Sequence, residues 1–111
     1  MHYYESDDLA RFESVGKFAP ELMKKFFDYY GAVTGTEGAL SKREKALIAL
    51  AVAHAKKCPY CIDAYTKACL EAGSDPEQMT EAIHVAAAME AGITLVHGVQ
   101  MQNALAKQGA M

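Results

Sequence analysis

The chain has 111 residues, of which 51% are hydrophobic and 23% are charged, and its net charge at pH 7 is -3. This length predicts a single domain, residues 1–111, that can bury a core without a disulfide or metal staple. The composition excludes disordered and collagen-like proteins. A nucleic-acid-binding surface would show as a basic patch or stripe, so the acidic balance predicts that the protein has no nucleic-acid partner.

The amino-terminal residues MHYYESDDLA are acidic and lack the positive region and the apolar run of a secretory signal. No stretch approaches the ~18 uninterrupted apolar residues of a membrane-spanning helix. We therefore expect a cytoplasmic protein without membrane contact. In a reducing compartment a Cys-x-x-Cys pair, here Cys58 and Cys61, is more typical of redox chemistry or metal binding than of a structural bridge. The remaining cysteine, Cys69, is expected to fill a small space in the core.

Hydrophobic spacing predicts helices in the first part of the chain. Apolar residues recur at helical intervals between Leu9 and Phe18, which predicts a short first helix. Pro20 suits the first turn of a second helix, and the glycines at 31, 35 and 38 are expected to end that helix in a loop.

The stretch ALIALAVAHA, residues 46–55, is apolar at every position except His54. A helix that is apolar on every side is tolerated in a soluble protein only if other helices enclose it. Ser41 followed by Glu44 three residues later forms a capping-box pattern, which predicts that this third helix begins at that point. We expect it to run to about Lys57 and to be the enclosed core helix.

The second half of the chain continues the helical pattern. Pro59 suits the first position of a fourth helix, roughly residues 59–72, and Gly73 is expected to end it. A fifth helix should begin before Pro76, and Gly92 marks an expected break or kink, after which the pattern continues to about Lys107. No period-two strand pattern of useful length occurs. The sequence therefore predicts an all-α fold, a compact helical bundle of five to six helices.

The cysteine pair stands where one predicted helix ends and the next begins. A helix start leaves amide donors unpaired and carries a partial positive charge, which favours a thiolate over a thiol, and Lys56 and Lys57 act in the same direction. Cysteines in such pairs can have pKa values from ~3.5 to ~7.5, against ~8.5 when free. Cys58 and Cys61 would also have their Cα atoms at about the 5.5 Å that a disulfide prefers. We therefore expect a pair that opens and closes reversibly.

Such a pair can reduce a peroxide. A thiolate attacks the peroxide oxygen and becomes a sulfenic acid, its neighbour traps it as a disulfide, and an external dithiol restores both thiols. Three residues are candidates for proton transfer. His54 lies four residues before Cys58, Tyr65 shares a helical face with Cys61, and His84 lies on the fifth helix. The alternatives are that His54 is a core histidine with a satisfied hydrogen bond and that Tyr65 only packs in the core.

The segments REKALIALAVAHA and CPYCIDAY resemble the carboxymuconolactone decarboxylase family, and in particular its alkylhydroperoxidase D-like branch. The resemblance covers about residues 40–105. Within that branch, CPYCIDAYTKAC is similar to a peroxidase-like subgroup associated with arsenosugar biosynthesis. The resemblance implies an all-helical fold assembled into trimers or hexamers, and thiol-dependent reduction of hydroperoxides at the expense of an external dithiol or thioredoxin-like reductant.

The resemblance also implies roles for individual residues. It makes Cys61 the thiol that the peroxide attacks and Cys58 the thiol that resolves it. Family members relay protons through a glutamate and a histidine, whose positions hold Ala46 and Tyr65 in this chain. His54 is the replacement that we expect for this relay.

Other functions stay open at this point. The protein could be a non-enzymatic redox sensor or a helical assembly module. A zinc site could use Cys58, Cys61, His54 and His84, although no second paired motif is present. A decarboxylase would call for groups that bind an anionic lactone and for no cysteine pair. Because no haem, flavin or nicotinamide motif occurs, we expect no cofactor and no metal, with the thiols as the redox centre.

Overall fold

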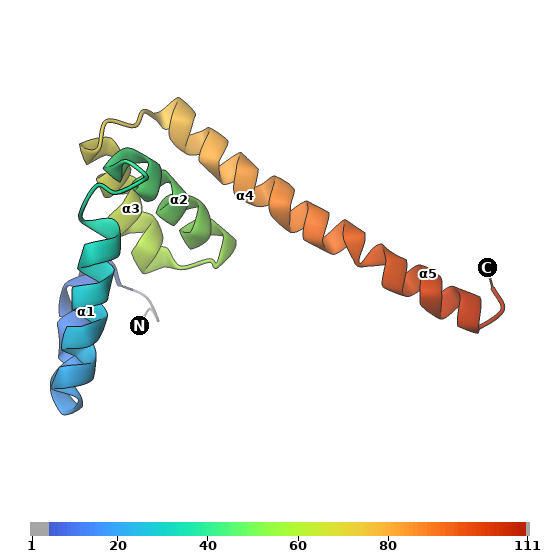
Figure 1. The fold of residues 1–111 in the computed structure, drawn as a ribbon, viewed down its shortest axis with the longest axis horizontal. Helices are drawn as coiled ribbons and strands as arrows, with labels where there is room; N and C mark the ends of the chain where they lie inside the picture. Colours follow the sequence, from blue (N-terminus) through green and yellow to red (C-terminus); the bar gives the residue numbers. More distant parts are fainter. Residues whose placement is uncertain (1–4, 111) are drawn as a thin grey trace.

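The computed structural model describes residues 5–110, which form helices joined by short connections, with no strand in that range. In chain order these are the 3-10 helix η1 (Ser6–Phe18) and the α-helices α1 (Pro20–Thr34), α2 (Lys42–Ala55), α3 (Pro59–Glu71), α4 (Pro76–Val96) and α5 (Gly98–Lys107) (Figure 1). The predicted all-α fold with five to six helices is confirmed.

Capping side chains and prolines begin the helices where the sequence predicted. The Ser41 hydroxyl accepts the Glu44 N–H at 3.1 Å, and the Glu44 carboxylate accepts the Ser41 N–H at 2.8 Å, so the capping box of α2 is confirmed. Proline occupies the first position of α1, α3 and α4, where a helix needs no amide donor. These starts depend on local contacts alone.

Two predicted interruptions are wrong. Gly31 lies inside α1 and Gly92 inside α4, because one glycine costs a helix only about 1 kcal/mol when apolar neighbours continue the pattern. The break falls instead at His97, whose Nδ1 lies 2.6 Å from the Ile93 carbonyl oxygen. A carbonyl oxygen only accepts, so the imidazole donates to it.

The first helix also differs from the prediction. η1 is a 3-10 helix of 13 residues, although most 3-10 runs end within about four residues. Its residue Gly16 is buried, and a Cβ there would overlap the side chain of Met23 on α1. This close approach lets η1 lie against α1.

The core lies where α2 packs against α3 and α4. Its buried apolar residues are Ala46, Leu50, Ala53 and Cys69. Cys69 is fully buried and fills a small core space, as predicted. The opposite side of α2 is open, since Ile48 and Val52 are 51% and 53% exposed. The prediction that other helices enclose α2 is therefore wrong for the single chain, in which only one face is covered.

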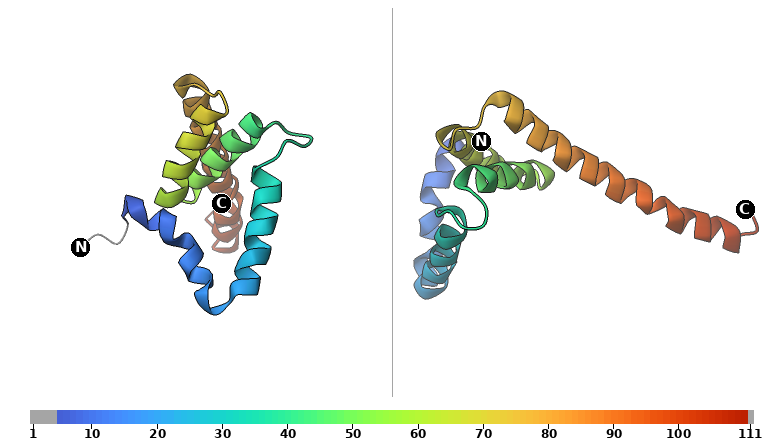
Figure 2. Two further views of the ribbon diagram at one scale, coloured as in Figure 1. Left: turned by 90° about the vertical axis from the view of Figure 1, so that its left-hand side faces the viewer. Right: turned by 45° about the horizontal axis from the view of Figure 1, so that its top comes forward.

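The carboxyl-terminal helices project from the rest of the molecule. The first part of α4 packs on α2, whereas the rest of α4 and all of α5 extend away from the other helices (Figures 1 and 2). The radius of gyration is 19.1 Å, against about 13 Å for a compact domain of this size. The predicted compact bundle is therefore wrong for this end of the chain.

Candidate functional site

A tight turn carries the chain from α2 to α3 and positions the cysteine pair. The Lys57 N–H donates to the His54 carbonyl at 3.2 Å, and the Cys58 N–H donates to the Ala53 carbonyl at 3.0 Å, which is the Schellman pattern. The pattern needs one residue in the left-handed conformation, and Lys57 adopts that conformation with a φ of 57°. The chain thus reverses within a few residues and leaves Cys58 as the N-cap of α3.

The two cysteines lie side by side at the start of α3. The Cys58 Sγ accepts the Cys61 N–H at 3.4 Å, and the two Sγ atoms are 2.8 Å apart. Both thiols are free and half-buried. A disulfide needs about 2.05 Å between its sulfur atoms, so a small rotation of the side chains is enough to close the bond.

The electrostatics of the pair differ from the expectation. The pKa of Cys61 is raised from 9.0 to about 11, first by burial and then by the hydrogen bond and the negative charge of Cys58. The predicted lowering is therefore wrong for Cys61. Of the two sulfur atoms, the Cys58 Sγ is the one that accepts an N–H at the positive end of α3. Burial also raises the pKa of Cys69.

A cavity of about 480 Å³ opens beside the pair, between η1 and the start of α3. It is lined by Asp8, Leu9, Arg11, Phe12, Ser14 and Val15 from η1 and by Cys58, Tyr60 and Cys61. Most of these walls are apolar. The cavity can therefore take a small, largely apolar molecule and bring it against the two sulfur atoms.

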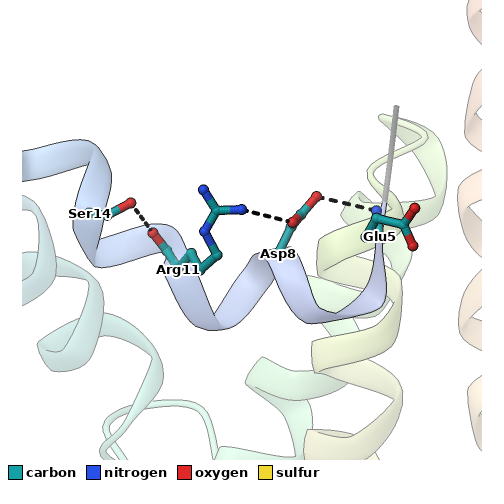
Figure 3. A network of polar contacts seen from close by, with 4 residues as sticks. All are labelled: Glu5, Asp8, Arg11 and Ser14. Carbon is teal, nitrogen blue, oxygen red and sulfur yellow. Dashed lines mark hydrogen bonds and ion pairs between the residues drawn. The ribbon is translucent and has the colours of Figure 1, made fainter. Parts of the chain in front are cut away.

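One edge of this cavity is polar, because Asp8, Arg11 and Ser14 of its lining belong to the network of polar contacts in Figure 3. Arg11 and Asp8 form an ion pair at 3.4 Å, and Asp8 also accepts the Glu5 N–H at 3.3 Å. The Ser14 hydroxyl donates to the Arg11 carbonyl at 2.6 Å. The Arg11 side chain is 77% exposed, so its guanidinium stands at the solvent edge of the cavity.

An aromatic cluster holds η1 against α1. Phe12 of η1 lies 5.2 Å from Phe27 and 6.0 Å from Phe26 between ring centroids, and Phe26 lies 5.6 Å from Tyr30. The pKa of Tyr30 is raised by burial and then by the negative charge of Cys61, so the Tyr30 phenol lies within electrostatic reach of that thiol. Sequence reasoning missed this neighbour, because helical spacing assigns Tyr30 to one face of its helix but does not identify what that face contacts.

The predicted proton-transfer residues lie elsewhere. The His54 Nδ1 is 2.9 Å from the carbonyl oxygen of Leu50, which lies one turn before His54 on α2 and therefore further from the cysteines. Tyr65 packs against the core and lines a different cavity beside the start of α2. His84 is exposed on α4. Among the described residues, the structure brings together Cys58 and Cys61, and the lining of their cavity includes none of these three.

The zinc alternative finds no support in the geometry. Over residues 5–110, no group of three or more histidine, cysteine, aspartate or glutamate side chains is arranged to hold a metal ion. Of the four residues considered for zinc, Cys58 and Cys61 lie together, whereas His84 is exposed on α4 and the His54 ring is bonded to its own helix.

Comparison with known proteins identifies the family of this chain. The sequence model of the carboxymuconolactone decarboxylase family matches residues 20–104. The crystal structure of a carboxymuconolactone decarboxylase family protein from Legionella pneumophila, solved in its apo form, is similar, with a TM-score of 0.62 and 29% identity over 96% of this chain and 100% of that one. An uncharacterised protein in the cox locus of Paracoccus denitrificans is 49% identical over 65 residues, which are 59% of this chain and 59% of that relative's length. On this match, the chain belongs to the carboxymuconolactone decarboxylase family.

Proposed function

We propose that the protein is a thiol-dependent peroxidase of the alkylhydroperoxidase D-like kind, which reduces organic hydroperoxides through Cys58 and Cys61. The observation that carries the proposal is the placement of two free sulfur atoms, 2.8 Å apart, in the wall of a largely apolar cavity. Membership of a family with alkylhydroperoxidase-like members supports it. The reducing cytoplasm is the compartment that we propose, because it keeps such a pair in the dithiol form.

The reaction balances with the two thiols and one hydroperoxide. One thiolate attacks the terminal peroxide oxygen, the O–O bond breaks, and the leaving alkoxide takes a proton to become an alcohol. The sulfenic acid that remains is attacked by the second thiol, and the S–S bond forms as the hydroxyl leaves with a proton as water. Two electrons pass from the dithiol to the peroxide. An external dithiol or a thioredoxin-like protein returns them by thiol–disulfide exchange.

The electrostatics support an order of attack opposite to the one that the resemblance implied. Because the pKa of Cys61 is about 11, Cys61 keeps its proton at neutral pH. The Cys58 Sγ instead accepts an N–H at the positive end of α3. We therefore assign the attack on the peroxide to Cys58 and the resolution of the sulfenic acid to Cys61.

The same arrangement supplies a proton. The Cys61 thiol stands 2.8 Å from the attacking sulfur, so its proton can pass to the leaving oxygen. The predicted His54 relay stays a second route. It can reach the cysteines only through Nε2, since the Leu50 carbonyl holds Nδ1–H.

The test is consumption of cumene hydroperoxide with dithiothreitol as electron donor, corrected for the reagent alone. We expect turnover by the wild type, loss of turnover in Cys58→Ser and in Cys61→Ser, and retention in Cys69→Ala, whose cysteine is buried away from the cavity. In Cys61→Ser, a sulfenic acid should be trapped on Cys58 by dimedone. No consumption above the reagent control would contradict the proposal and leave the redox-sensing or structural alternative.

A further inference from the structure

The helix η1 presents two parallel rows of side chains to the cavity beside the cysteines. A 3-10 helix has three residues per turn, so side chains three positions apart lie directly above one another. The residues that line the cavity from η1 fall into an apolar row and a polar row: Leu9, Phe12 and Val15, and Asp8, Arg11 and Ser14. The other wall of the cavity holds the two sulfur atoms. A molecule lying along η1 therefore contacts apolar and polar groups side by side.

Within the polar row, Arg11 is the group with donors to spare. Both oxygens of the Asp8 carboxylate are engaged, since Oδ1 accepts from the Arg11 guanidinium at 3.4 Å and Oδ2 accepts the Glu5 N–H at 3.3 Å (Figure 3). Arg11 uses one of its five N–H donors in the contacts of the described residues, and its side chain is 77% exposed. The polar row can therefore bind an anionic group more readily than a cationic one.

The cavity has room for one acyl chain. At roughly 30 Å³ for a group the size of a water molecule, its volume of about 480 Å³ holds about 16 such groups. Residues 8–15 extend about 14 Å along η1 at 2.0 Å per residue, so the apolar row is long enough to follow an extended chain. The two acyl chains of a phospholipid exceed this volume.

We propose that the cavity selects hydroperoxides of free fatty acids, with Arg11 binding their carboxylate and the apolar row of η1 contacting the chain. This inference rests on the proposed peroxidase activity and names its substrate class. A guanidinium is planar and always charged, and it can bind a carboxylate through two parallel hydrogen bonds. The carboxylate stays at the solvent edge, where Arg11 lies, while the hydroperoxide reaches the sulfur atoms. The reaction is unchanged, and its products are the hydroxy acid, water and the disulfide.

The helix that carries this selectivity lies before the part of the chain that matches the family. The family model matches residues 20–104, whereas η1 ends at Phe18. The sulfur atoms thus belong to the matched part, and the wall opposite them does not. The family match alone therefore does not define the substrate of this chain.

The test compares kcat/KM for linoleic acid hydroperoxide and for its methyl ester in the dithiothreitol-coupled assay, with both substrates below the concentration at which they form micelles. The ester lacks the charge of the acid and is otherwise closely matched to it. We expect the wild type to prefer the acid about tenfold, which one charge-assisted contact at an exposed site can supply. Arg11→Gln should bring the ratio of acid to ester close to one. Because the ratio is taken within one protein, a general loss of activity cancels, and circular dichroism checks that the variant stays helical.

Two further variants separate the charge of Arg11 from the charge of η1 as a whole. Lys17→Gln is the matched control, because Lys17 lies outside the lining of this cavity with its Nζ 5.7 Å from the centre of the Phe18 ring. Its ratio of acid to ester should equal that of the wild type. Asp8→Asn should raise the ratio at least about twofold, because it removes the negative charge beside the guanidinium while its amide oxygen can still accept the Glu5 N–H.

The outcomes distinguish this inference from the proposed function. Turnover of cumene hydroperoxide with equal kcat/KM for the acid and the ester would overturn the inference and leave the peroxidase activity standing. An equal loss of the ratio in Lys17→Gln, or no rise in Asp8→Asn, would rule out Arg11 as the carboxylate site. Reduction of a phosphatidylcholine hydroperoxide in vesicles as fast as that of the acid would rule out the restriction to free fatty acids. No turnover of any substrate would contradict the proposed function and this inference with it.

Discussion

Replacing Cys58 should make Cys61 more acidic and faster to alkylate. At pH 8, a thiol with a pKa of about 11 is thiolate in about 1 molecule in 1000, whereas a pKa of 9.0 would give about 1 in 10. Burial, the largest cause of the shift, stays in Cys58→Ser, but the negative charge of the neighbouring sulfur is lost. We therefore expect the pKa of Cys61 to fall towards 9.0 without reaching it, and the thiolate fraction to rise on the order of tenfold.

The assay is the rate at which iodoacetamide modifies Cys61, followed by peptide mass spectrometry across the alkaline range in the reduced protein. In the wild type the rate should rise about tenfold for each pH unit until the pKa of about 11 is approached. The Cys58→Ala variant is the matched control, because it also removes the hydrogen-bonding group and so separates that contribution from the charge.

Either of two results would refute this reasoning. If Cys61 of the wild type titrated below pH 8, or if its pKa did not respond to the loss of Cys58, the two thiols would not share charge as we infer. In the first case Cys61 would be the attacking thiolate, as the family resemblance implied, and the order of attack in the proposed reaction would reverse.

Three further predictions concern the turns on either side of α3 and the contact between η1 and α1. Lys57→Gly should stabilise the fold by about 0.5–1 kcal/mol in urea denaturation, because the left-handed conformation costs about 1–2 kcal/mol in a residue with a side chain, partly offset by the backbone entropy of glycine. The reverse change, Gly73→Ala at φ 92 in the matching turn after α3, should destabilise by a similar amount. Gly16→Ala should push η1 away from Met23 and at least double the alkylation rate of Cys58, while an unchanged rate would mean that η1 does not shield the cavity.

The helix boundaries could be predicted because they depend on neighbours in the sequence. Ser41 and Glu44 cap each other across three residues, and Pro76 begins α4 by the same local logic. The misplaced break shows the limit of this logic. Glycine at position 92 predicts an interruption of the helix, but the helix breaks at His97. The His97 side chain competes there with the backbone for the Ile93 carbonyl oxygen.

The candidate site could be predicted only as far as its local part. The three-residue spacing of Cys58 and Cys61 guaranteed that their sulfur atoms would meet on one helical turn. The cavity wall from η1 and the Tyr30 neighbour depend on how η1 packs against both α1 and α3, which no spacing encodes. The role of His54 stays a prediction, because its side chain leans towards the amino terminus of the helix and its ring bonds to the Leu50 carbonyl, further from the cysteines.

The two departures from the family's proton relay are neighbours in the fold. Ala46 is 7% exposed, Tyr65 packs against the core that contains it, and both line the cavity beside the start of α2. A glutamate at position 46 without a histidine beside it would be a buried charge without its partner, which is costly. The two replacements therefore make sense as one change, in which a tyrosine fills the space and the buried charge is gone. Because the chain has neither the glutamate nor the histidine of that relay, we infer that the proposed reaction takes its proton from the Cys61 thiol.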